Sequence, residues 1–138
     1  MAVSSFQSQA EPRALAAQSP RHLGKRLLLV DDQQPVREAI TLLLSLDQHA
    51  VVEAADGVEA LELFMRERFD LVITDFDMPR MKGNELAVRI KRLSPSQPIL
   101  MITAYAERLG DAENPVDAIL NKPFQLEELR QAMAKLLA

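Results

Sequence analysis

Six polar side chains that could carry out chemistry lie at or just beyond the ends of short apolar runs. They are Asp31, Asp32, Asp75, Asp77, Thr103 and Lys122. If the apolar runs are parallel strands, all six lie at the carboxyl edge of one sheet, where such folds place their sites. We therefore expect them to converge on a single pocket.

Carboxylates that share one pocket repel each other, and burying them unpaired is costly. A hard divalent cation with oxygen ligands offsets this repulsion. Mg²⁺ suits the pocket because it uses few carboxylates, keeps water ligands and accepts a phosphate oxygen. Asp31 and Asp32 are the candidates to hold the ion, and Lys122 adds a further positive charge.

A carboxylate can also attack phosphorus and form an acyl phosphate. Phosphoryl transfer mainly needs in-line positioning and neutralised phosphoryl oxygens, which a metal ion, an ammonium and a hydroxyl provide. Asp75 as nucleophile, Lys122 as ammonium and Thr103 as hydroxyl complete such a set. The residue types therefore predict metal-assisted phosphorylation of Asp75.

The apolar runs that position these residues are short and rich in β-branched side chains. They span residues 27–30, 50–54, 71–74, 98–102 and 116–120. Runs of this kind are typical of parallel strands covered on both faces. With the amphipathic stretches between them, they predict an α/β fold, a doubly wound five-stranded parallel sheet with helices on both faces. We expect the domain to span residues 26–138, after a flexible tail at residues 1–25.

Helix signals separate the runs. Pro35 suits a first helical turn, and Asp56 followed by Glu59 indicates an N-terminal cap. The helical spacing of apolar residues predicts buried stripes, which are Val58, Leu61 and Met65 in one helix and Leu86, Ile90 and Leu93 in the next. We expect His49 in an exposed turn and an atypically short fourth helix within residues 105–115.

The composition excludes several classes of protein. No cysteine is present and the two histidines lie far apart, which excludes disulfides, thiol nucleophiles and a zinc site. The formal charge of −4 gives no electrostatic footprint for nucleic acid. No apolar run approaches the roughly 20 residues that span a bilayer, and the first residues show no continuous apolar core like that of a signal peptide. We expect a cytoplasmic protein that binds neither nucleic acid nor membrane.

Four motifs, in order along the chain, resemble the signature of bacterial two-component response regulators in their receiver domain. They are Val30-Asp31-Asp32, Asp75-Phe76-Asp77-Met78-Pro79 with Gly83, Thr103-Ala104 and Lys122-Pro123-Phe124. The resemblance covers residues 26–138 and implies a flavodoxin-like (CheY-like) fold. It implies that Asp75 accepts phosphate from a histidine kinase or a histidine phosphotransfer protein and then switches protein–protein contacts.

The same resemblance implies roles for the other site residues. Asp31, Asp32, Asp75 and the backbone carbonyl of Asp77 would hold Mg²⁺. Lys122 would contact the phosphate, Thr103 would move to bond it, and the bond from Lys122 to Pro123 is expected in cis. Such a protein is a phosphoacceptor switch, which catalyses only its own phosphorylation and dephosphorylation and is no turnover enzyme.

The chain departs from the family pattern in two places. Ile119 stands where receiver domains carry a tyrosine or phenylalanine that swings inward on activation, so the usual coupling of Thr103 to an aromatic ring is in doubt. Tyr105 is the only tyrosine, and it either reports the switch state or gates access to the phosphoryl group. The shortened fourth helix indicates that the output surface is unusual.

Three alternatives stay open. The Asp75-Phe76-Asp77 motif also matches Asp-x-Asp phosphatases, but that interpretation leaves Asp31 and Asp32 without a role. A receiver-like fold could serve only as a binding module. A working receiver could be a stand-alone adaptor, which we favour because the chain ends with the fifth helix, or part of a longer regulator or hybrid kinase.

Overall fold

The computed structural model describes residues 23–104 and 114–138. Five parallel strands form one sheet in the order β3-β2-β4-β5-β6. The strands are β2 Arg26–Val30, β3 Ala50–Ala54, β4 Leu71–Asp75, β5 Ile99–Thr103 and β6 Ala118–Asn121. The helices of the described residues are α2 Gln34–Ser45, α3 Gly57–Arg66, α4 Gly83–Leu93 and α5 Leu126–Leu137. The predicted doubly wound α/β fold is confirmed.

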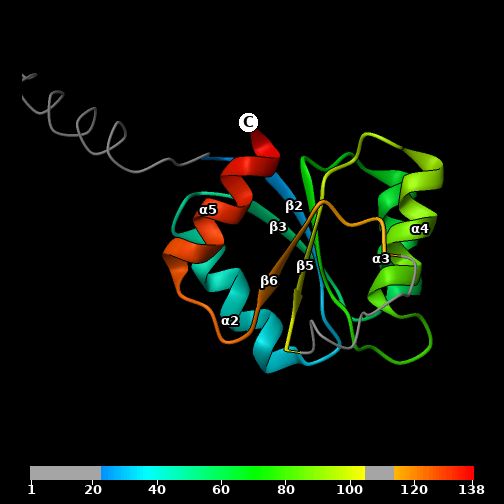
Figure 1. Ribbon diagram of the computed structural model, residues 1–138, viewed down its shortest axis with the longest axis horizontal. Coiled ribbons are helices and arrows are strands. Elements are labelled where there is room, and N and C mark those ends of the chain that lie inside the picture. The colour runs from blue at the N-terminus through cyan, green and yellow to red at the C-terminus, as the bar shows by residue number, and fades with distance from the viewer. Residues whose placement is uncertain (1–22, 105–113) are drawn as a thin grey trace, which may run out of the picture.

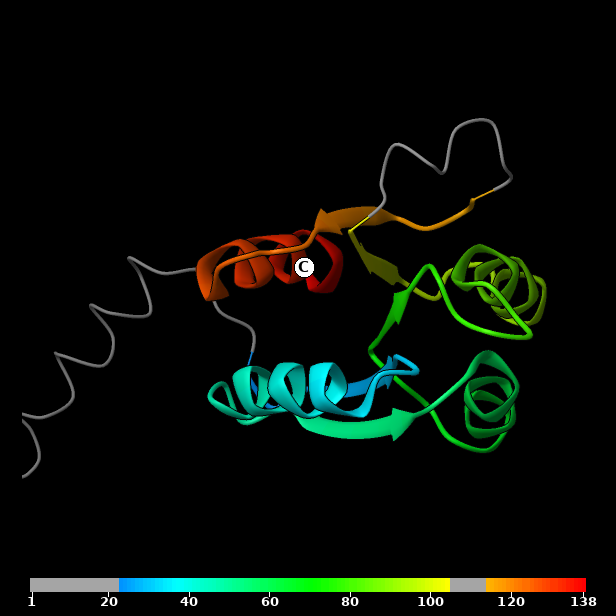
Figure 2. The ribbon, with the colours of Figure 1, turned by 90° about the horizontal axis from the view of Figure 1, so that it is seen from below.

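The helices cover both faces of the sheet. Figure 1 and Figure 2 show α2 and α5 on one face and α3 and α4 on the other. Successive residues of one strand therefore enter different cores. Leu27 and Leu29 pack with the cluster under α2 and α5, whereas Leu28 and Val30 pack with the cluster under α3 and α4. This explains why the central strands carry consecutive apolar residues, at 27–30, 71–73 and 99–102, as expected of a parallel sheet buried on both sides.

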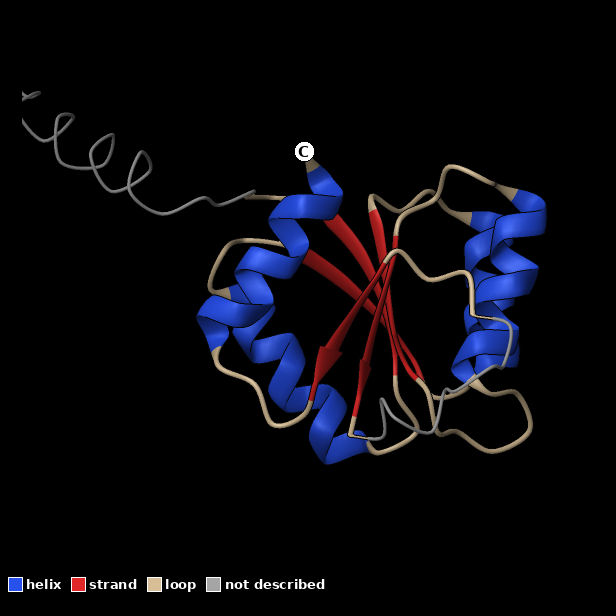
Figure 3. Ribbon diagram, in the orientation of Figure 1, coloured by secondary structure: helices blue, strands red, loops and turns tan. Residues whose placement is uncertain are grey.

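All five strands run in the same direction, so their carboxyl ends share one edge of the sheet (Figure 3). We call this the carboxyl edge, and the opposite edge the amino edge. β6 lies at the side of the sheet, and burial alternates along it. None of the helices in the described ranges combines the length and the apolar composition needed to cross a bilayer.

The helix starts agree with their sequence signals. Pro35 lies in the first turn of α2, where its missing N–H has no intrahelical partner to lose. The Asp56 carboxylate caps α3 by accepting the Glu59 N–H at 2.8 Å. The Glu59 carboxylate in turn accepts the Ala55 N–H at 2.8 Å, one residue before the cap. Both bonds satisfy backbone donors that a helix start leaves open.

The predicted buried stripes of α3 and α4 were partly wrong. Val58 is 44% exposed, Met65 is 62% exposed, and Leu93 at the end of α4 is exposed as well. The buried residues of α3 are Gly57 and Ala60, with Leu61, Leu63 and Phe64 partly buried beside them. Small residues let α3 approach its neighbours closely, which rotates the helix away from the stripe that larger apolar residues indicated.

The amino edge holds buried polar contacts. His49 was expected in an exposed turn, but it is buried, and its Nδ1 accepts the Lys25 N–H at 3.0 Å just before β2. Asp47, also buried, accepts two hydrogen bonds from the Arg130 guanidinium of α5 at 2.8 and 3.0 Å. These contacts join the turn after α2 to both β2 and α5. The expected short fourth helix falls mainly within residues 105–113, outside the described part of the chain.

Candidate functional site

Three carboxylates meet at the carboxyl edge. Strands β2 and β4 are neighbours in register, with Val30 opposite Thr74, so the residues that follow come side by side. One oxygen from each of Asp31, Asp32 and Asp75 lies within 4.8 Å of the others. Asp31 is only 2% exposed, whereas Asp32 lies open to solvent. Together with Lys122 these three residues are called the acid pocket below.

Lys122 enters this pocket from the loop after β6. Its Nζ lies 3.4 Å from Asp31 Oδ2 and 3.6 Å from Asp75 Oδ1. Its N–H donates to the Thr103 carbonyl at 2.9 Å, which anchors the loop to the end of β5. The bond from Lys122 to Pro123 is cis, as expected. One ammonium thus lies between the ends of β2 and β4.

The remaining sequence-predicted residues differ in their placement. Thr103 is fully buried as the last residue of β5, at the same edge as Asp75. The Asp77 carboxylate is half exposed and forms an ion pair with Lys82, at 2.5 Å from Oδ1 to Nζ. Ile119 lies on β6 and is 42% exposed. Tyr105 lies outside the described residues, so its expected role stays a prediction.

The electrostatics of the acid pocket act most strongly on Asp75. Burial raises the pKa of its carboxyl group above the usual 3.8, and the charges of Asp31 and Asp32 raise it further. Lys122 opposes this rise, as does the Phe76 N–H that Asp75 Oδ1 accepts at 2.9 Å. The net rise in the pKa is due first to burial, which the charge of Lys122 does not fully offset.

This donor set fits Mg²⁺. Two to three carboxylate oxygens at an open edge leave room for the water ligands that the ion keeps. Burial and the two neighbouring carboxylates raise the pKa of Asp75, and a divalent cation bound there would favour its charged form. Beside the carboxylates lies a pocket of about 210 Å³, lined by Asp75, Asp77, Lys122, Gln33, Val36 and Ala104.

Gly83 determines how closely α4 approaches the acid pocket. Its N–H donates to the Phe76 carbonyl at 2.9 Å, which closes the loop after β4. A Cβ atom at this position would lie 2.1 Å from the Asp75 carbonyl oxygen. Only glycine therefore lets α4 start directly against the main chain of the candidate nucleophile.

Arg37, which touches the site, and its partner Glu53 were both missed from the sequence. Arg37 donates from Nη1 to the Asp31 carbonyl at 2.6 Å, and its Nε donates to Glu53 Oε1 at 2.8 Å. The available signal was Glu53 itself, a charged residue inside the apolar run at residues 50–54. A carboxylate in a strand of a covered sheet needs a partner, and Arg37 is that partner.

Comparison with known proteins identifies the family. A family model described as the response regulator receiver domain matches residues 27–134. "Response regulator MprA" of Mycobacterium sp. (strain KMS) is 41% identical over 115 residues. That match covers 81% of this chain and 50% of the relative, so the chain spans about half the length of the curated relatives it matches.

Solved structures agree. The response regulator TrrA of Thermotoga maritima, in complex with Mg²⁺-BeF, has a TM-score of 0.78 and 34% identity, covering 82% of this chain and 99% of that one. The chemotaxis protein CheY4 of Vibrio cholerae has a TM-score of 0.74 and 32% identity, covering 83% and 99%.

TrrA is also known in complex with the histidine kinase ThkA, and in that complex it has a TM-score of 0.76 and 34% identity, covering 83% of this chain and 99% of TrrA. The match favours the receiver interpretation over an Asp-x-Asp phosphatase. The chain belongs to the response-regulator receiver-domain family of two-component signalling.

Proposed function

We propose that Asp75 is the phosphoacceptor of a two-component signalling switch. The observation that carries the proposal is the grouping of its carboxylate with those of Asp31 and Asp32, beside the Lys122 ammonium. An Asp75 oxygen attacks phosphorus, and the bond from phosphorus to the donor breaks as the acyl phosphate forms. The product stays on the chain, so the protein is a phosphoacceptor and no turnover enzyme.

Asp31, Asp32, Asp75 and the backbone carbonyl of Asp77 are proposed to hold Mg²⁺, which would supply positive charge to the transferred phosphoryl oxygens. Lys122, whose Nζ lies 3.4 Å from Asp31 and 3.6 Å from Asp75, supplies a second positive charge. Thr103, buried at the end of β5, is placed at the edge where its hydroxyl could bond the phosphoryl group after transfer. The added charge would then bias a two-state equilibrium at the end of β5, where Thr103 lies.

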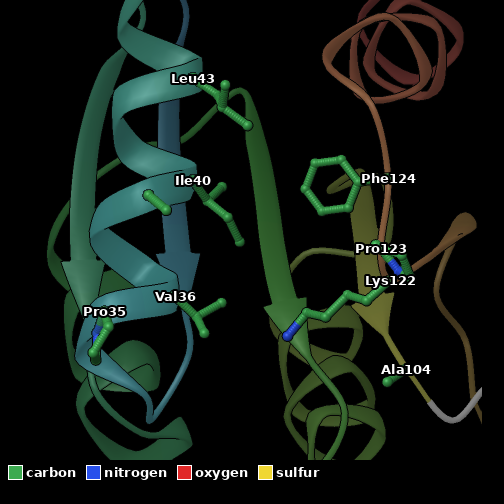
Figure 4. A pocket seen from close by; sticks show the side chains of 9 residues that line it. Pro35, Val36, Ile40, Leu43, Ala104, Lys122, Pro123 and Phe124 are labelled. Carbon is green, nitrogen blue, oxygen red and sulfur yellow. The ribbon is translucent and has the colours of Figure 1, made fainter.

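The proposed phosphodonor is a histidine kinase or a histidine phosphotransfer protein. An apolar groove of about 570 Å³ lies between α2 and the loop from β6 to α5 (Figure 4). Its walls include Val36, Ile40, Leu43 and Phe124, and the Lys122 side chain extends from it toward the end of β4. Lys122 lines both this groove and the pocket beside Asp75. A donor helix in the groove would therefore present its histidine to Asp75.

The test of the phosphoacceptor is intact mass after incubation with acetyl phosphate, with and without Mg²⁺. The parent should gain a single phosphoryl adduct that requires Mg²⁺, and Asp75→Asn should gain none. Asp77→Asn is the matched control, because it removes a nearby carboxylate and should still accept phosphate. A folded parent without an adduct, or an adduct on Asp75→Asn, would overturn the assignment of Asp75.

The docking groove is tested separately with Phe124→Ala. This variant should lose phosphotransfer from a purified kinase while its reaction with acetyl phosphate is unchanged. Equal losses with both donors would show that Phe124 supports the acid pocket and not the docking of a protein.

The proposed output is a change in protein–protein contacts made by this domain, acting in the cytoplasm and without direct nucleic-acid binding. The length of the curated relatives makes a receiver joined to an output domain the second candidate. The length of the encoded chain distinguishes the stand-alone adaptor from the longer regulator.

A further inference from the structure

One arginine connects three elements behind the acid pocket. Arg37 lies in the first half of α2, and its side chain is 14% exposed. Its Nη1 donates to the Asp31 carbonyl at 2.6 Å, and its Nε donates to Glu53 Oε1 of β3 at 2.8 Å. The guanidinium therefore ties the main chain of a candidate metal ligand to both a helix and the neighbouring strand.

Glu53 is itself held in place. Its second carboxylate oxygen accepts the Thr41 hydroxyl of α2 at 3.1 Å. Asp31 is bonded to β3 from its other side, since its N–H donates to the Ala54 carbonyl at 3.2 Å. Bonds to α2 and β3 thus fix both peptide groups that flank the Asp31 Cα. We call Arg37, Glu53 and Thr41 the Arg37 bridge.

The position of the Asp31 carbonyl determines where two carboxylates lie. The peptide that begins at this carbonyl leads into Asp32, so its rotation would move the Asp32 side chain. The Asp31 side chain is tied to the same turn, because its Oδ1 accepts the Gln33 N–H at 2.9 Å. A guanidinium can bridge two acceptors at once because its donors form a rigid fork.

We propose that Arg37, held by Glu53, is a positioning residue that sets the geometry of Asp31 and Asp32 for Mg²⁺. This inference rests on the proposed function of the acid pocket. Arg37 touches neither the ion nor the phosphoryl group, and it acts through the main chain of Asp31. Groups that orient metal ligands in this way typically contribute about tenfold or more to metal affinity.

Charge and geometry predict opposite results when Arg37 is removed. Arg37→Met deletes a positive charge near three carboxylates, which by Coulomb attraction alone would tighten Mg²⁺ binding. Loss of the bond to the Asp31 carbonyl would weaken it. The double variant Arg37→Met with Glu53→Gln deletes one charge of each sign, so the net charge is that of the parent. Weaker binding in both variants can only come from lost positioning.

The experiment is a titration with MgCl₂ followed by backbone amide chemical shifts, together with thermal unfolding of each variant without metal. Arg37→Met and the double variant should bind Mg²⁺ about tenfold more weakly than the parent. Arg130→Met is the matched control, because Arg130 is 15% exposed and forms a similar pair with Asp47 at the amino edge. It should lower thermal stability while leaving Mg²⁺ affinity unchanged.

A second readout separates positioning from general damage. At saturating Mg²⁺, Arg37→Met should react with acetyl phosphate at nearly the parent rate, since the ion restores the turn. If Arg37→Met or the double variant unfolds, Arg37→Lys is tested in its place, because it keeps the charge and one donor. It should also bind Mg²⁺ more weakly than the parent does.

Unchanged or tighter Mg²⁺ binding in the double variant would overturn the positioning role, and so would an equal loss in Arg130→Met. If the parent binds Mg²⁺ and accepts phosphate, either result leaves the proposed function intact. A folded parent that neither binds Mg²⁺ nor accepts phosphate would overturn both.

Discussion

Replacing Gly83 by alanine should destabilise the protein although alanine is the better helix former. An added Cβ would lie 2.1 Å from the Asp75 carbonyl oxygen, and real Cβ atoms essentially never come closer than 3.0 Å to such a neighbour. The start of α4 or the main chain of Asp75 must therefore shift by about 0.9 Å or more. Neither side of this contact is a flexible side chain, so the strain cannot be relieved by a rotamer change.

The magnitude follows from two opposing effects. Overpacking of a rigid contact costs up to about 3 kcal/mol. Alanine at a helical position recovers about 1 kcal/mol relative to glycine. The expected net loss is therefore up to about 2 kcal/mol in the free energy of unfolding. Because a misplacement near 1 Å can reduce a positioned reaction by about 10²-fold, phosphorylation of Asp75 should slow by a similar factor.

Urea unfolding followed by circular dichroism measures the loss of stability, and the time course of intact mass with acetyl phosphate measures the rate. Gly57→Ala is the control at the first position of α3. There the added Cβ meets the Met81 side chain, with Sδ at 2.8 Å and Cβ at 2.9 Å, so the overlap is only about 0.2 Å and its nearest neighbours are side-chain atoms. The control should lose less stability and keep the phosphorylation rate. A Gly83→Ala variant that is as stable as the parent would refute the steric reasoning.

Three further results are expected for the acid pocket. Without metal, Asp75→Asn should be more stable than the parent at neutral pH, because it removes an anion whose pKa is raised by burial and by Asp31 and Asp32. A lower urea midpoint for the variant than for the parent, with chelator present, would contradict this. The folded parent holds the Asp75 proton more tightly than the unfolded chain does, so its metal-free stability should fall as pH rises from 3.8 through the raised pKa. The urea midpoints of Asp75→Asn should fall less across that pH range than those of the parent. Without metal, Lys122→Met should lower the free energy of unfolding by about 2 kcal/mol, less than the loss of a fully buried partner, because Lys122 is partly exposed. Calorimetry should show that Mg²⁺ restores part of this loss. An unchanged melting temperature would show that the Lys122 ammonium does not stabilise the pocket.

The arrangement of the acid pocket could be predicted because it depends on strand direction. Once the apolar runs are taken as parallel strands, the residues that follow them must share one edge, as Asp31, Asp75 and Lys122 do. No side-chain detail is needed for that step. The fold and the meeting of these residues therefore follow from periodicity and order along the chain.

The missed features depend on packing partners, which periodicity does not specify. Val58 and Met65 have the spacing of a buried stripe, but the small residues Gly57 and Ala60 set the side that faces the core. His49 is polar and lies between two elements, yet its ring accepts the Lys25 N–H and is buried. Arg37 finds Glu53 sixteen residues away, across the boundary of a helix and a strand.

The ends of the described chain lie at the amino edge. The Gly24 N–H donates to the Asp47 carbonyl in the turn after α2 at 3.2 Å, and α5 runs back from the carboxyl edge to the C-terminus at Ala138 (Figure 1). A fluorophore, affinity tag or surface tether attached at Ala138 would therefore leave the approach to Asp75 clear. For the same reason a dye at that end would be a poor reporter of phosphorylation. Labels meant to follow the switch belong at the carboxyl edge, for example at the exposed Ala104.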